Sequence, residues 1–176
     1  MANRNCRGLI VFLRIRAALL TLTLLGISIP VRAANNCPWI NASTVSGLLG
    51  APATATYTGT APFQPGACTF VAKIEGGSRA LTVNVEVASE AANRVRTILG
   101  QCAAGPSRID AIGNEAWLCE VGGKKGARSD LVVGRVRDQV FSITIGSALK
   151  NDPGFDPVSI RSAASTAAEQ VSGNLF

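Results

Sequence analysis

The sequence contains no histidine, and aromatic residues make up only 5% of its 176 residues. Without histidine, neither a Ser-His-Asp nor a Cys-His catalytic site can form. No two cysteines stand in a CxxC pair, so the usual zinc-ligand spacings are missing as well. We therefore expect no catalytic, cofactor-binding or metal-binding residues of these classes.

A serine with a lysine base is the one nucleophilic arrangement that remains. Ser129 near Lys124 and Lys125 is its only local candidate. A catalytic lysine needs burial to lower its pKa, whereas the glycine-rich stretch around these lysines is typical of a hydrophilic hairpin tip. We interpret the three residues as part of such a turn.

Acidic residues offer two pairs for general acid and base chemistry, Glu115 with Glu120 and Asp152 with Asp156. Charge at a strand edge explains the first pair, and helix capping explains the second. The oxygen-rich segment 151–157 has the donors that calcium prefers, but it lacks a 12-residue loop ending in glutamate. Asp156 followed by Pro157 is typical of a helix start.

The N-terminal segment has the pattern of a cleaved secretory signal peptide over residues 1–33. Basic residues come first, an uncharged run of 13 residues follows, and small residues stand near Ala33, where we expect cleavage. A membrane-spanning helix needs roughly 20 apolar residues, so an uncleaved anchor is the weaker alternative. The basic residues before the uncharged run are Arg4, Arg7, Arg14 and Arg16.

Removal of this segment changes the charge of the protein. Five of the 17 Lys and Arg lie in residues 1–33, which leaves 12 basic against 11 acidic residues in the predicted mature domain, 34–176. A nearly neutral domain without clustered basic residues lacks the charge that phosphate backbones attract, so we expect no nucleic-acid partner. Asn35 and Asn36 precede Cys37 where a lipid-attachment site has small residues, so we also expect no stable membrane anchor.

Four cysteines remain in the mature domain, namely Cys37, Cys68, Cys102 and Cys119. An even number in an exported chain indicates disulfides, and four cysteines allow three pairings. Cys68 and Cys119 lie on predicted strands, whereas Cys37 precedes a helix and Cys102 ends one, so we expect each bridge to join a helix to the sheet. We prefer the more local pairing, Cys37 with Cys68 and Cys102 with Cys119.

Hydrophobic periodicity predicts three helices and about six strands. Helices are expected at residues 41–50, 89–100 and from Asp156 onward, with Asn41 or Ser43, Ser89 and Asp156 at their starts. Strands are expected at residues 54–60, 67–74, 81–87, 117–121, 131–136 and 140–145, and residues 106–112 are interpreted as a connector. Short connections favour antiparallel pairing. We therefore predict an α+β domain with two layers, a mostly antiparallel sheet and helices on one face.

Five short segments stand out along the chain: LLG at 48–50, CTF at 68–70, IGNEAW at 112–117, VVGRVRDQVFSITI at 132–145 and AAEQVSGNLF at the end. Together they resemble the small secreted domains of bacterial lipoproteins of unknown function and their extracellular sensor-type relatives. The resemblance implies a curved antiparallel sheet flanked by helices and a role as an envelope sensor or binding protein. It assigns no functional residue.

These observations predict a periplasmic or secreted binding or interaction module whose partner is an unknown envelope ligand or protein. The alternative is a structural or accessory envelope protein without a ligand, and a small hydrolase is the third hypothesis. Trp39 and Trp117 each stand two residues from a cysteine. An indole there either packs over a disulfide or lines a ligand cleft on the sheet face.

Overall fold

Seven strands and three helices make up residues 36–59, 64–122 and 127–176, the parts of the chain that a computed structural model describes. The predicted signal peptide and Lys124 and Lys125 lie outside these residues. The helices are α1 (Ala42–Leu49), α2 (Ala91–Leu99) and α3 (Pro157–Gly173). The strands are β1 (Ala53–Gly59), β2 (Gly66–Ile74), β3 (Gly77–Val87), β4 (Ser107–Ile109), β5 (Glu115–Gly122), β6 (Arg128–Val136) and β7 (Gln139–Ser147).

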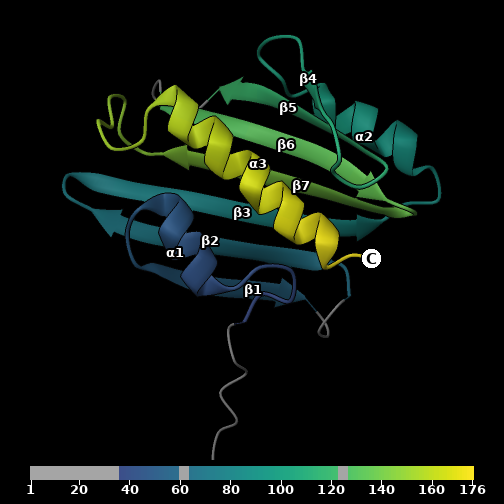
Figure 1. The fold of residues 1–176 in the computed structure, drawn as a ribbon, viewed down its shortest axis with the longest axis horizontal. Coiled ribbons are helices and arrows are strands. Elements are labelled where there is room, and N and C mark those ends of the chain that lie inside the picture. The colour runs from purple at the N-terminus through teal and green to yellow at the C-terminus, as the bar shows by residue number, and fades with distance from the viewer. Residues whose placement is uncertain (1–35, 60–63, 123–126) are drawn as a thin grey trace, which may run out of the picture. The chain divides into compact units, whose positions relative to one another are not determined.

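The strands form one antiparallel sheet in the order β1-β2-β3-β7-β6-β5-β4, and the three helices pack against it (Figure 1). This confirms the predicted α+β class. The sheet has one strand more than expected, because the segment interpreted as a connector contains β4. A three-residue strand is too short to produce a recognisable alternation, which is why the sequence pattern missed it.

Alternating side chains divide the sheet into two faces. The face that we call the α3 face carries the main core and is covered by α1 and α3. Four alanines of α3 are almost completely buried against it, and α3 crosses the sheet obliquely (Figure 1). The alanines are Ala163, Ala164, Ala167 and Ala168.

Helix α2 lies on the opposite face, called the α2 face below, so the expectation that all helices share one face is wrong in this respect. Val95 and Ile98 of α2 form a second apolar cluster with Leu131 and Val133 of β6. Val132, between these two β6 residues, belongs to the main core instead. An unbroken apolar run at 131–133 is the pattern of a strand buried on both faces.

Two disulfides attach one helix on each face, α1 and α2, to the sheet. Cys37, before α1, is bonded to Cys68 of β2, and Cys102, after α2, is bonded to Cys119 of β5. This is the pairing that the sequence favoured. In the chain-entropy model, each bridge contributes about 3–4 kcal/mol. Two disulfides indicate an oxidising compartment.

The helix caps follow the sequence in two of three cases. Asn41 accepts a hydrogen bond from the Thr44 amide, and Asp156 accepts from the amides of Val158 and Ser159. The predicted Ser89 cap is wrong, since α2 begins after Glu90 and has no side-chain cap. Within the described residues, no helix has the length and apolarity required to span a membrane.

Candidate functional site

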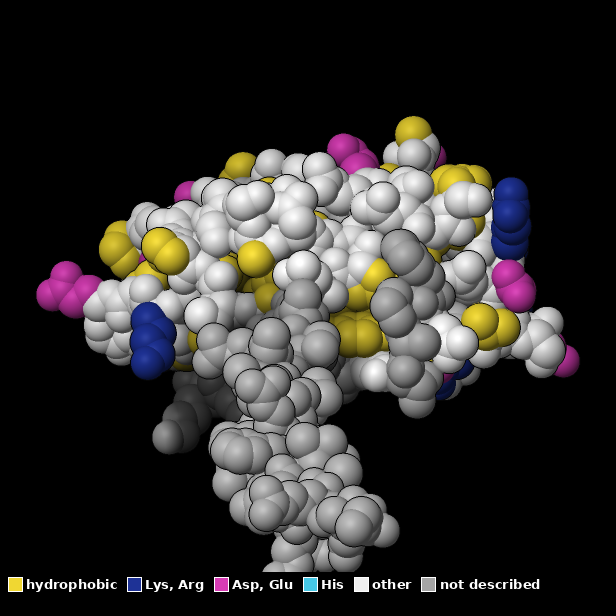
Figure 2. Space-filling model, turned by 90° about the horizontal axis from the view of Figure 1, so that it is seen from below, with side chains coloured by type: hydrophobic (Ala, Val, Ile, Leu, Met, Phe, Trp, Pro, Cys, Tyr) yellow, Lys and Arg dark blue, Asp and Glu magenta, His cyan; other side chains and the backbone are white. Residues whose placement is uncertain are grey.

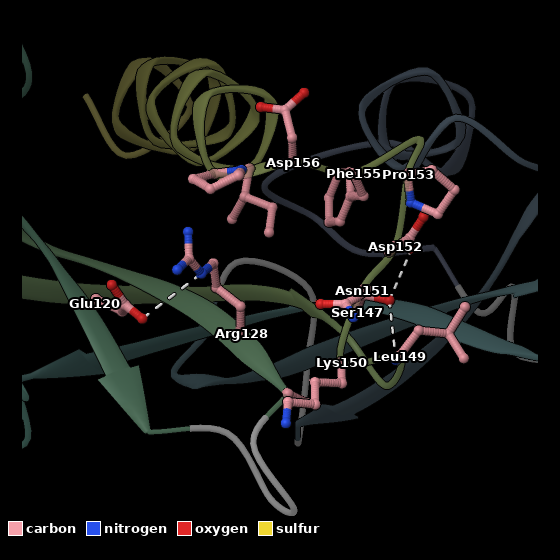
Figure 3. A pocket seen from close by; sticks show the side chains of 13 residues that line it. Glu120, Arg128, Ser147, Leu149, Lys150, Asn151, Asp152, Pro153, Phe155 and Asp156 are labelled. Carbon is pink, nitrogen blue, oxygen red and sulfur yellow. Dashed lines mark hydrogen bonds and ion pairs between the residues drawn. The ribbon is translucent and has the colours of Figure 1, made fainter.

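A cleft of about 650 Å³ opens where α3 begins, between the β7–α3 loop (residues 148–156) and the ends of β5 and β6 (Figure 3). Its volume lies in the range typical of small-molecule sites. Its lining residues are Glu120, Ala127, Arg128, Ser147, Leu149, Lys150, Asn151, Asp152, Pro153, Phe155, Asp156, Pro157 and Ile160.

Asp152 holds the β7–α3 loop through a buried ion pair with Arg79 of β3. The Arg79 guanidinium donates to both carboxylate oxygens, from Nε over 2.8 Å and from Nη2 over 2.6 Å. Ser147 Oγ donates a third hydrogen bond over 2.8 Å, and the Gly154 amide a fourth over 3.2 Å. The guanidinium and these additional donors lower the pKa of Asp152 to about 2. Asp152 is therefore an ionised structural group that shapes the cleft.

The same guanidinium connects the loop to α1. Arg79 Nη1 donates to the Leu49 carbonyl over 2.7 Å, and the guanidinium carbon lies 4.9 Å from the ring centre of Phe155. A β-carbon at position 154 would lie 2.7 Å from Arg79 Nη2, so a larger residue there would force this guanidinium to shift. These contacts fix the floor of the cleft around Phe155, which is itself buried.

Asp156 is engaged at the start of α3. Its Oδ1 accepts from the Val158 amide over 2.8 Å and from the Ser159 amide over 3.1 Å, and its Oδ2 accepts from Ser159 Oγ over 2.9 Å. The hydrogen bonds from Ser159 lower the pKa of the Asp156 carboxyl, with a further contribution from Val158. The carboxylate is thus used as a helix cap, as the sequence predicted.

The opposite wall of the cleft carries Glu120 of β5 and Arg128 of β6, which Figure 3 shows facing each other across the two strands. Arg128 Nε lies 3.7 Å from Glu120 Oε1. Lys150 of the loop is exposed and makes no ion pair within the described parts of the chain. All three lining carboxylates therefore have partners, although those of Asp156 are neutral donors. Lys150 is the one cation of the lining without an ion-pair partner among the described residues.

Asp130 lies next to this wall but does not line the cleft. It stands directly across from Glu120 in the β5–β6 ladder and is only 3% exposed. Its Oδ2 has no hydrogen-bond partner, and Arg161 Nε of α3 is 3.7 Å away. Burial raises the pKa of the Asp130 carboxyl. The positive charge of Arg161 lowers this pKa again, but only in part.

Sequence reasoning missed Asp130, although the alternation of β6 contained the signal. Residues 130, 132 and 136 share one face of the strand, and Val132 and Val136 belong to the core. Extending this period of two by one step places Asp130 under α3. An acid at an inward position of a strand is a buried polar group and therefore a feature to examine.

Of the two carboxylate pairs proposed from the sequence, only Asp152 and Asp156 lie in a common site. Glu115 and Glu120 point to opposite faces of β5, where Glu115 binds Arg135 with Nε to Oε1 at 2.6 Å. The Arg135 guanidinium lowers the pKa of Glu115. Asp152 and Asp156 line one cleft, but each binds different partners. Ser129 lies on the α2 face of β6, away from the cleft.

Both tryptophans lie in packed clusters. Trp39 is 1% exposed and meets Tyr57 edge to face, with 5.9 Å between the ring centres. Trp117 packs with the cluster around α2, which includes Cys119. Neither indole lines the cleft at α3, so the interpretation of the tryptophans as core residues near disulfides fits their positions.

Comparison with protein-family models, curated proteins and solved structures gave no match to this chain. Fold and site together define the protein as an α+β domain with two disulfides and an open cleft at one end of its sheet. Any function must therefore be argued from the chemistry of the residues themselves.

Proposed function

We propose that this protein is a periplasmic or secreted binding module that holds a small amphipathic anion in the cleft at the start of α3. The observation that carries the proposal is the division of the lining into an apolar floor and one unpaired cation. The exposed Pro153 and Pro157 and the half-buried Leu149 supply apolar surface beside the buried Phe155 and Ile160. Lys150 supplies the cation. An organic acid with an apolar body matches both parts.

The existing partners of the acidic side chains favour an anion over a cation. The carboxylates of Asp152 and Asp156 already accept several hydrogen bonds each, and Glu120 faces Arg128. A cationic ligand would compete with these partners, whereas an anionic group meets Lys150 without displacing anything. Because the Lys150 ammonium is exposed, its attraction is screened by salt, so we expect affinity to fall as ionic strength rises.

The buried contacts beneath the cleft favour binding by a preformed site. The Arg79–Asp152 pair, the Ser147 hydroxyl and the Phe155 ring hold the loop in one arrangement. A site that is already ordered loses less conformational entropy when a ligand binds. An ordered cleft therefore supports a ligand-binding role. A ligand-free accessory protein would not need such a cleft.

A hydrolytic role has less support. General acid catalysis requires a carboxyl group of raised pKa within reach of the substrate. Asp130 has a raised pKa, but its carboxylate is sealed behind the cleft wall. The carboxylates that do line the cleft act as ion-pair partners or as a helix cap. We therefore propose a binding protein without enzymatic activity.

The compartment is part of the proposal. The two disulfides suit an oxidising environment outside the cytoplasm. The basic and apolar N-terminal pattern and the resemblance to secreted domains of bacterial lipoproteins point in the same direction. We propose that the mature form is a soluble envelope protein.

Isothermal titration calorimetry with octanoate, and with 1-octanol as a neutral analogue, tests the proposal. Octanoate should bind more tightly than 1-octanol at low salt. Lys150→Glu should weaken octanoate binding by about tenfold, equivalent to about 1.4 kcal/mol. Lys73→Glu is the matched control, since Lys73 is an exposed lysine on the other face of the sheet. Equal affinity for the two compounds, no binding of either, or equal effects of the two substitutions would overturn the proposal.

A further inference from the structure

The α2 face is only partly covered by its helix. Helix α2 packs over β5, β6 and β7, and the half formed by β1, β2 and β3 has no helix against it among the described residues. Figure 2 looks at the molecule from the β1 side. In that view, the visible Lys and Arg side chains lie toward the two ends, and acidic side chains lie at the ends and along the upper margin.

Four threonines stand in direct register across this open half. Thr56 of β1 pairs with Thr69 of β2, Thr69 with Thr82 of β3, and Thr82 with Thr144 of β7. All four are exposed or half-buried, and they share one face because register partners point the same way. With strands about 4.8 Å apart, this threonine row spans about 14 Å.

The row ends in a groove of about 520 Å³ between α2 and the sheet. Hydroxyl and amide groups line the groove. They belong to Thr144, Ser142, Asn84 and Gln101, the last of which follows α2. Its two charged residues compensate each other, because Arg94 Nη2 lies 3.3 Å from Glu86 Oε2 and Arg94 Nε donates to the other oxygen. The groove is therefore polar and carries no uncompensated charge.

We infer that this groove and the threonine row bind an uncharged polysaccharide whose chain runs across the strands. Hydroxyl and amide side chains both donate and accept hydrogen bonds, which suits the hydroxyls of a sugar. Threonine methyl groups offer contacts for the C–H faces of sugar rings. The length of the row fits several linked sugars rather than one.

Other occupants fit less well. An anionic polymer needs several unpaired Lys or Arg, but Arg94 is held by Glu86 and the threonine row and groove contain no other Lys or Arg. A tight protein interface is usually centred on buried aromatic or arginine anchors. The residues of the row and groove include no aromatic side chain. This site lies on the face opposite the cleft at α3 and does not depend on the function proposed for that cleft.

Amide-resolved NMR titration of the intact mature domain with chitohexaose, cellohexaose and polygalacturonate tests the inference. We expect at least one of the two neutral oligosaccharides to shift the amides of Thr82, Asn84, Gln101 and Thr144, and the anionic polygalacturonate to bind more weakly. No shifts with either neutral oligosaccharide, shifts confined to other regions, or equal binding of polygalacturonate would overturn the inference. Retention on insoluble chitin or cellulose then distinguishes wall-like polymers from free oligosaccharides.

Substitutions test this site and the cleft at α3 independently. The double substitution Thr82→Val with Thr144→Val keeps the side-chain shape and should weaken oligosaccharide binding at least about fivefold. Thr166→Val, at an exposed threonine of α3, is the matched control and should change nothing. Lys150→Glu should reduce octanoate binding and leave oligosaccharide binding unchanged. An unaltered affinity in the folded double variant would contradict the proposed contacts.

Discussion

Arg79 and Asp152 are 73 residues apart in the chain, and their side chains form a two-point ion pair that is almost completely removed from solvent. The Arg79 side chain is 10% exposed and that of Asp152 is 4% exposed. The pair links β3 to the loop before α3, and the bond from Arg79 to Leu49 extends the connection to α1. One guanidinium thus connects three elements of the α3 face.

Asp152→Asn should lower the free energy of unfolding by about 3–5 kcal/mol, because it leaves the buried Arg79 charge without its counter-ion. Urea unfolding at pH 7 measures the change. Glu86→Gln serves as the control, since the Arg94–Glu86 pair is exposed and such pairs contribute about 1 kcal/mol or less. Similar losses of unfolding free energy in the two variants would contradict a special contribution of the buried Arg79–Asp152 pair.

The effect of Asp152→Asn should also depend on pH. The pKa of Asp152 is about 2 in the folded protein, below its value of about 3.9 in an unfolded chain. The ionised carboxylate therefore stabilises the fold above about pH 4, and this contribution disappears as pH falls toward 2. The difference between wild type and variant should shrink over that range, and a constant difference would contradict the ion pair as its cause.

Asp130 should show the opposite dependence on pH. Burial raises its pKa in the folded protein, so folding favours the protonated form. Its stabilising contribution is fully present below the unfolded value of about 3.9 and is lost as pH rises through the folded pKa. Relative to the wild type, Asp130→Asn should become progressively more stable as pH increases from 4 to 7.

Urea unfolding of both proteins at several pH values measures this relative change. A difference in the free energy of unfolding that is the same at every pH would come from the new amide group. The prediction concerns only the change of this difference with pH. Carbon-13 NMR titration of the Asp130 carboxyl provides a direct second measurement. A titration midpoint at or below that of aspartate in an unstructured peptide would contradict the assignment.

Two glycine-to-alanine substitutions should have opposite signs. Gly113 has φ +58°, and a β-carbon there would collide with the Arg135 carbonyl oxygen, so Gly113→Ala should destabilise the fold by about 2 kcal/mol or more. Gly47 lies on the exposed side of α1 with nothing within 4 Å of an added β-carbon. Gly47→Ala should stabilise the fold by about 0.5–1 kcal/mol. Urea unfolding at pH 7 checks both signs.

The candidate cleft was only partly visible in the sequence. Asp152 and Asp156 were identified as neighbouring acids, and the helix-capping role followed from the adjacent Pro157. Arg79 could not be assigned to the same site, because its partner comes from a loop 73 residues later. The alternation of β6 was sufficient to predict that Asp130 points inward, but this residue was not identified from the sequence.

Local patterns by themselves determined most of the secondary structure, the antiparallel α+β class and the preferred cysteine pairing, because these depend on the spacing of apolar residues and on short-range turns and caps. Tertiary structure alone decided that α2 packs on the opposite face from α3, that Thr56, Thr69, Thr82 and Thr144 form one row, and that Arg79 neutralises Asp152. The physical reason is that strand order and register bring together side chains whose separation along the chain carries no local signal.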